Sequence, residues 1–178
     1  MTGKNTAVFG IYRDRAHVEE GVDTLLDNGF RSEDISVLLP ENPGTKDFAT
    51  EKHTKAPEGT ATGAVAGGVV GGTLGLLAGI GALAIPGLGP FIAAGPIMAA
   101  LAGSAAGATA VGIAGALVGF GIPEYEAKRY EGKISRGNVL ISVHCEDRNN
   151  VHAAKRVLQD AGAEDISDTG EASVPSHA

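Results

Sequence analysis

A run of 65 residues without Asp, Glu, Lys, Arg or His, from Gly59 to Pro123, constrains this chain more than any other feature. The 14 Lys and Arg residues and the 21 Asp and Glu residues all lie in the two flanking segments. So long an uncharged stretch does not form a solvated surface, because folded proteins rarely expose large contiguous apolar patches. The run must therefore be buried against protein or lipid.

Small residues recur every four positions within this run. Four-residue spacing stacks small side chains along one ridge of a helix, where a second backbone can approach closely. We predict two Gly/Ala-rich helices that contact each other along such ridges. The predicted helix-packing residues are Gly63, Gly67, Gly71, Gly75, Gly79, Gly103, Gly107, Gly112, Gly115 and Gly119.

The centre of the run is rich in Pro and Gly, which interrupt helices. We predict that this centre is the turn of a helical hairpin that occupies residues 59–123. The predicted turn residues are Pro86, Gly87, Gly89, Pro90 and Pro96. Residues 40–58 lack periodicity and are predicted to form a linker into the hairpin.

The flanks show the alternating strand and helix patterns of a small α/β domain. Apolar runs predict strands at residues 7–12, 35–39 and 139–145 and near Ile166. Amphipathic periodicity and turn signals predict helices at residues 16–28, 123–135 and 150–161. We expect one domain built from both flanks.

The two flanks also share a sequence pattern. Asp14-Arg15, Val18, Leu25 and Gly29 recur at a constant offset as Asp147-Arg148, Val151, Leu158 and Gly162, and each copy continues to Glu-Asp-Ile-Ser. A strand–helix–strand unit present twice predicts a ferredoxin-like split βαβ domain. Chance similarity of two short amphipathic helices is the alternative explanation.

The predicted fold class is therefore α+β, a ferredoxin-like domain interrupted by a Gly/Ala-rich two-helix hairpin. Residues 1–39 and 124–170 would form the two halves of the domain. Residues 171–178 would form a polar tail.

Composition excludes several classes of partner. The net charge of −7 and the absence of Trp argue against nucleic acid, which needs a basic footprint and aromatic stacking. The single cysteine, Cys145, cannot form an internal disulfide and fits a reducing compartment. The N-terminus lacks the pattern of a signal peptide, so we expect a location in the cytoplasm or on the cytoplasmic side of a membrane.

The hairpin could cross a membrane. Residues 64–85 would span about 33 Å as a helix, close to the thickness of the hydrocarbon core, about 30 Å. Lys and Arg residues precede and follow the run, whereas its centre has none. By the positive-inside rule, both termini would lie on the cytoplasmic side of the inner membrane, with lipid as a partner.

The alternative is a soluble homo-oligomer in the cytoplasm, in which hairpins from several chains bury one another. This assembly predicts the same lack of charge and the same small ridges. In both interpretations the chain is expected to associate with itself.

The sequence offers no catalytic constellation. His144 and Cys145 are neighbours on a predicted strand and should point to opposite faces, so a shared metal is not expected. The segment Gly79–Ala84 matches a dinucleotide-binding glycine pattern, but it does not follow a predicted strand. We therefore predict no catalytic residue, cofactor, metal or small-molecule substrate, and no enzymatic activity.

Three motifs carry a resemblance to a known family. These are His53-Thr54-Lys55-Ala56-Pro57-Glu58-Gly59, Ile85-Pro86-Gly87-Leu88-Gly89-Pro90 and Gly121-Ile122-Pro123-Glu124-Tyr125-Glu126-Ala127. With them the chain resembles, over nearly its whole length, bacterial general stress or low-temperature-induced proteins with a glycine-zipper insertion. The resemblance implies induction under stress and a membrane or assembly role, and it supplies no catalytic residues.

A similar layout, an α/β domain around a two-helix membrane insertion, occurs in a subunit of quinol-oxidising complexes. This chain offers no cofactor ligands for such a redox role. The sequence therefore favours a non-enzymatic stress-associated protein that anchors in a membrane or self-assembles through its hairpin, with the α/β domain as an interaction surface.

Overall fold

The computed structural model describes residues 5–40, 81–85, 89–107 and 112–170. Within these ranges the strands are β1 (Thr6–Tyr12), β2 (Ile35–Pro40), β3 (Gly81–Ile85), β4 (Gly89–Ala94), β5 (Val139–Cys145) and β6 (Glu164–Gly170). The helices are α1 (Arg15–Asp27), the 3-10 turn η1 (Ser32–Asp34), α4 (Pro96–Gly107), α5 (Gly112–Gly119), α6 (Glu124–Ile134) and α7 (Arg148–Asp160). The chain is therefore a mixed α+β protein, as predicted.

The strands form one antiparallel sheet in the order β3-β4-β2-β5-β1-β6. Strand β5, from the C-terminal flank, lies between β1 and β2 of the N-terminal flank. Strands of the two flanks therefore interleave in one sheet.

The repeated sequence pattern corresponds to repeated structure at the two helix starts. Asp14 precedes α1 and its carboxylate accepts a hydrogen bond from the His17 N–H. Asp147 precedes α7 and its carboxylate accepts one from the Asn150 N–H. Both aspartates are N-caps, which satisfy backbone donors that have no partner within the helix.

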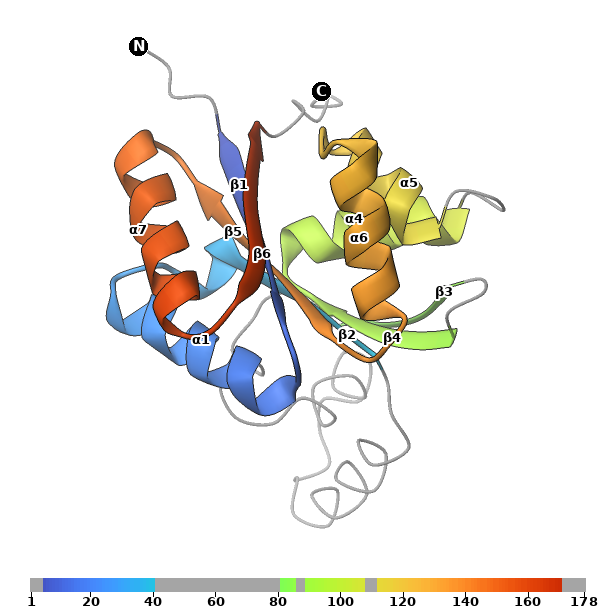
Figure 1. The fold of residues 1–178 in the computed structure, drawn as a ribbon, viewed down its shortest axis with the longest axis horizontal. Helices are drawn as coiled ribbons and strands as arrows, with labels where there is room; N and C mark the ends of the chain where they lie inside the picture. Colours follow the sequence, from blue (N-terminus) through green and yellow to red (C-terminus); the bar gives the residue numbers. More distant parts are fainter. Residues whose placement is uncertain (1–4, 41–80, 86–88, 108–111, 171–178) are drawn as a thin grey trace, which may run out of the picture.

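Helices cover both faces of the sheet (Figure 1). Helices α1 and α7 lie together on one face, and α4, α5 and α6 lie on the other. Because side chains alternate along a strand, each central strand contributes to both layers. In β1, for example, Val8 and Tyr12 face α1 and α7, whereas Phe9 and Ile11 face the opposite layer.

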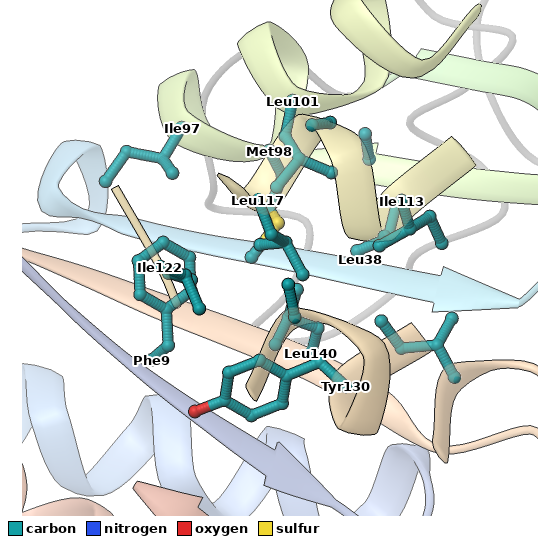
Figure 2. Close-up of a cluster of buried hydrophobic side chains, with 14 of the residues drawn as sticks. Phe9, Leu38, Ile97, Met98, Leu101, Ile113, Leu117, Ile122, Tyr130 and Leu140 are labelled. Atoms are coloured by element: carbon teal, nitrogen blue, oxygen red, sulfur yellow. The ribbon is translucent and has the colours of Figure 1, made fainter. Parts of the chain in front are cut away.

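The layer under α4, α5 and α6 is as apolar as the one under α1 and α7. Met98 and Leu101 of α4 and Leu117 of α5 are fully buried over the sheet. Figure 2 shows these side chains gathered above Phe9 and Leu140. Two helices from the uncharged run therefore complete the hydrophobic core of the domain.

The prediction of helix through residues 81–85 is wrong, because these residues form strand β3, paired with β4. Strand β4 in turn pairs with β2, so this part of the run extends the sheet. The physical reason is that β2 presents an unpaired backbone edge, whose hydrogen bonds a neighbouring strand can satisfy. Residues 64–80 of the predicted first helix lie outside the described residues.

The predicted turn also differs from the structure. Gly89 and Pro90 begin strand β4, and Pro96 is the first residue of α4. Pro86 and Gly87 lie outside the described residues. Proline suits the first turn of α4, because a backbone N–H at that position would have no acceptor within the helix.

The second half of the run contains two helices, α4 and α5, where the sequence suggested one. Neither is a separate hairpin arm, since both contribute buried side chains to the layer over the sheet. The sheet face formed by Phe9, Leu38 and Leu140 is itself apolar and needs a cover, and the nearest apolar segments supply it.

Candidate functional site

A polar cavity opens where the end of β5 meets the C-terminus of α1 and the N-terminus of α7. Its volume is about 370 Å³, within the size range of small-ligand pockets. The residues that line it are Asn28, Gly29, Phe30, Arg31, Asp34, His144, Glu146, Asn150 and Ala153. These residues come from both flanks, so the cavity exists only because the two halves interleave.

The ends of α1 and α7 place two amide side chains at this cavity. Helix α1 stops at Gly29, which has a φ of +89° and lets the Phe30 N–H donate to the Leu25 carbonyl at 3.1 Å. That left-handed conformation suits glycine, which has no Cβ atom. Asn28 lies at this end, and Asn150 lies in the first turn of α7.

Arg31 is held by carboxylates at the cavity wall. Its Nε and Nη2 atoms donate to the two carboxylate oxygens of Asp34 at 2.8 and 3.0 Å. Glu33 lies 2.7 Å from Nη1, and Glu146 lies 3.8 Å from Nη2. These neighbours raise the pKa of the Arg31 guanidinium group, chiefly because Asp34 accepts hydrogen bonds from it.

Carboxylates outnumber the guanidinium group at this wall, so the cavity is a poor site for an anion. Because Asp34 already occupies two donors of Arg31, an incoming phosphate or carboxylate would have to displace it. The cavity is suited to a small neutral or cationic group, or to a polar side chain of another protein.

His144 and Cys145 end strand β5 with different surroundings, as the sequence indicated. Cys145 is buried in the layer under α1 and α7, and its thiol donates to the Val143 carbonyl at 3.7 Å. His144 is half-buried and lines the cavity. Within the described ranges no group of three or more His, Cys, Asp or Glu residues could hold a metal ion.

A second polar cluster joins α6 to the edge strand β6. Lys133 lies 2.8 Å from Glu164 and 2.7 Å from Asp165, and Arg129 lies 3.4 Å from Asp165. Hydrogen bonds to these carboxylates raise the pKa of Lys133, and the bonds from Lys133 and Arg13 lower that of Glu164. The cluster fastens the helical layer to one side of the sheet.

Asp165 has an unusual backbone conformation within this cluster, with a φ of +49°. Strand β6 contains a bulge here, since Phe9 pairs with Ser167 but Ile11 pairs with Glu164. The Tyr130 hydroxyl donates to the Asp165 carbonyl and lies 2.8 Å from the Ser167 Oγ atom. Burial raises the pKa of Tyr130 to about 12, so this hydroxyl stays protonated at neutral pH.

The predicted helix-packing glycines are only partly within the described ranges. Gly63, Gly67, Gly71, Gly75 and Gly79 lie outside them. Gly103 and Gly107 belong to α4, and Gly112, Gly115 and Gly119 belong to α5.

The structure describes the surroundings of two of these glycines, Gly112 and Gly119. A Cβ atom on Gly112 would lie 3.1 Å from Oε2 of Glu131, the carboxylate that accepts the Ala114 N–H at 2.6 Å. A Cβ atom on Gly119 would meet nothing within 4 Å among the described residues. Gly112, with a φ of +59°, serves the start of α5, where Glu131 of α6 caps the helix.

Sequence reasoning missed Gly95 and Ser36, which join the uncharged run to the sheet. The Ser36 Oγ atom, buried on β2, accepts the Ile97 N–H of α4 at 3.2 Å. Gly95 has a φ of +91° and approaches the backbone of β2 closely. The Gly95-Pro96 pair at the start of α4 was the available signal, but such a pair could equally mark a turn.

None of the helices in the part of the chain that the structure describes combines the length and apolarity that crossing a bilayer requires. Comparison of the chain with protein-family models, curated proteins and solved structures gave no match.

Proposed function

We propose that this chain is a non-enzymatic, stress-associated protein that self-assembles through its uncharged, glycine-rich run and presents a ferredoxin-like domain as an interaction surface. The observation that carries the proposal is that the run is divided. In its second part, β3 and β4 form a strand pair and α4 and α5 cover one face of the sheet. Its first part, residues 59–80, has the same apolar, charge-free composition.

The ferredoxin-like assignment is supported by strand order and by the helical layers. The two β-α-β units are β1-α1-β2 and β5-α7-β6, and their four strands lie in the order β6-β1-β5-β2. Both helices of these units lie on the same face of the sheet (Figure 1). Interleaving of two such units defines the split βαβ arrangement.

The ends of the segment 41–80 favour self-assembly over a transmembrane hairpin. The segment leaves the sheet after Pro40 of β2 and re-enters it at Gly81 of β3, with only β4 between these strands. A membrane passage would therefore have to go out and return. Each crossing of a bilayer needs about 20 apolar residues. Residues 41–58 contain seven charged residues, so only residues 59–80 are apolar enough, and they suffice for one crossing.

Attachment to a membrane surface is the second candidate, and a sequence observation favours it. Lys46, Lys52 and Lys55 precede the uncharged residues 59–80, and basic residues beside an apolar segment favour contact with anionic lipid. In this case the segment would enter one leaflet and return without crossing.

Light scattering of the full chain tests the proposed self-assembly. Light scattering after size exclusion should show a concentration-dependent oligomer, which Gly71→Leu weakens and Val70→Leu leaves unchanged. The leucine at position 71 would separate helices that meet along the glycine ridge, whereas position 70 lies beside it. Equal behaviour of the two variants, or a chain that is monomeric at every concentration, would refute the glycine-zipper assembly.

Fractionation of expressing cells separates the two candidates. Protein that sediments with the membranes would support lipid attachment, and protein that stays in the supernatant before any wash would support assembly without lipid. The stress association has its own test, because the amount of the protein should rise after cold or osmotic shock.

A further inference from the structure

The two outer strands of the sheet differ in how their free edges are protected. β6 contains Glu164, Asp165 and Asp168 and a bulge at Asp165. Charges and bulges are the devices by which proteins prevent an edge strand from pairing with another chain. β3 has the sequence Gly-Ala-Leu-Ala-Ile, with no charge and no proline.

Two prolines define which backbone groups of β3 face outward. In an antiparallel pair, opposing residues alternate between those that exchange both hydrogen bonds and those that exchange none. Ala84 is opposite Pro90, and Pro40 is opposite Phe91. Proline has no N–H, so neither pair can be of the bonded type.

In β3, the residues that exchange both backbone hydrogen bonds with β4 are therefore Leu83, which is opposite Phe91, and the residues two positions away on either side, Gly81 and Ile85. The N–H and C=O groups of Ala82 and Ala84 point away from β4, toward the free edge. No described strand lies at that edge to accept them. Two donors and two acceptors are thus available in a five-residue strand.

We propose that β3 pairs antiparallel with β3 of a second copy of this chain, about a two-fold axis at Leu83. In this register Ala82 of each copy is opposite Ala84 of the other, so the outward groups of one strand meet those of its partner. Leu83 is opposite itself as a non-bonded pair. The strand is self-complementary in backbone pattern and in charge, which is what an isologous dimer contact requires.

This inference deepens the proposed function and rests on its claim of self-assembly. It adds a contact that does not depend on the glycine ridge of residues 63–79. Pairing would join the sheets of two domains into one continuous sheet.

Cysteine crosslinking of the full chain tests the register. In a non-bonded antiparallel pair the two Cα atoms lie about 4.5 Å apart, and a disulfide requires about 4.4–6.8 Å. Leu83→Cys should therefore form a disulfide-linked dimer in oxidised glutathione at least tenfold faster than Val118→Cys, an exposed control on α5. The unmodified chain should not crosslink, because Cys145 is its only cysteine and is buried.

A proline variant tests the backbone contact. Ala84→Pro removes an N–H that faces the free edge and leaves the pairing of β3 with β4 intact, so it should lower the crosslinking rate of Leu83→Cys at least tenfold. The far-UV circular dichroism should not change. Ala84→Val keeps the N–H and should crosslink like the parent.

The outcomes separate this inference from the proposed function. An oligomer that is sensitive to Gly71→Leu but whose Leu83→Cys variant crosslinks no faster than the Val118→Cys control overturns the β3 contact alone. A chain that is monomeric throughout overturns both. Loss of folding in Ala84→Pro, with slow crosslinking of Leu83→Cys, would mean that the chain's own segment 41–80 covers this edge, which also overturns the inference.

Discussion

Gly95 lies so close to the backbone of β2 that a Cβ atom added to it would be 2.7 Å from the Cα atom of Ser36. Directly after this contact the Ser36 Oγ atom accepts the Ile97 N–H, at the first turn of α4. One residue of the uncharged run and one residue of the sheet thus define where the helical cover begins.

Gly95→Ala should destabilise the protein by about 3 kcal/mol or more, because it combines a left-handed backbone with a clash against β2. Gly29→Ala is the matched control. Gly29 has a nearly equal φ of +89°, but no atom of the described residues lies within 4 Å of its added Cβ, so Gly29→Ala should cost only about 1 kcal/mol. Urea unfolding measures both, and equal losses would show that the approach to Ser36 is not tight.

Two buried serines on neighbouring strands should respond differently to alanine. Ser36 and Ser142 are paired across β2 and β5, and both are fully buried. Ser36→Ala removes the cap of α4 and should cost about 1 kcal/mol. The Ser142 hydroxyl has no hydrogen-bond partner among the described residues, so Ser142→Ala should change the unfolding free energy by less than about 0.5 kcal/mol. A larger loss for Ser142→Ala would contradict this assignment.

Gly21 of α1 makes room for the ring of Tyr12. A Cβ atom on Gly21 would lie 2.6 Å from Cζ of that ring. Gly21→Ala should therefore cost about 2 kcal/mol, although alanine is the better helix former.

Tyr12→Phe alone should be neutral or slightly stabilising, because the buried hydroxyl has no partner among the described residues. In the double variant that combines Gly21→Ala with Tyr12→Phe, the loss of unfolding free energy should be smaller than in Gly21→Ala alone. The reason is that the Tyr12 hydroxyl oxygen, the atom nearest to the added Cβ, is absent. Additive unfolding free energies in this double-mutant cycle would refute the contact.

The ion pairs of Lys133 should make stability depend on pH at the acid end. Because the pKa of Glu164 is lowered in the folded protein, its ionised form stabilises the fold above the unfolded pKa. That contribution is lost as the pH falls below about 4. The pKa of Lys133 is raised in the folded protein, so its charged form stabilises the fold at lower pH. This contribution is lost as the pH rises above about 10.

Lys133→Met should therefore flatten the decrease of the urea midpoint between neutral pH and pH 3. Lys155→Met, which removes the cation beside Asp168 in the same strand, is the control and should leave the contribution of Glu164 in place. An unchanged acid profile in Lys133→Met would show that the pairs with Glu164 and Asp165 contribute nothing to stability.

The helical cover of the sheet can be tested with two neighbours on α5. Leu117 is fully buried, whereas Val118 is 43% exposed. Leu117→Ala should cost about 3 kcal/mol, and Val118→Ala should cost less than about 0.5 kcal/mol. If Leu117→Ala were equally mild, α5 would not cover the sheet.

Strong local signals made most of the flanking elements predictable. The apolar run of residues 139–145 predicted β5 with its observed bounds. The helix predicted at residues 150–161 corresponds to α7, which begins at Arg148. The repeated Asp-Arg pattern lies at the starts of α1 and α7, and the glycines that follow the two helices, Gly29 and Gly162, have positive φ.

The candidate cavity was not predictable in the same way. Asn28, Arg31, His144 and Asn150 are separated along the chain, and none belongs to a motif with a defined spacing. They meet because β5 lies between β1 and β2 and because α1 and α7 lie side by side. No local pattern encodes that proximity.

The sequence by itself predicted that most of the run from Gly59 to Pro123 is covered by protein or lipid, because a charge-free segment of this length has no favourable exposure to water. It did not determine what would bury it. Small apolar residues such as those of β3 and α4 fit a strand or a helix about equally well, so their local preference is weak. The tertiary structure decided the outcome, because β2 offered an open edge to β4, and one apolar face of the sheet required the cover that α4 and α5 provide.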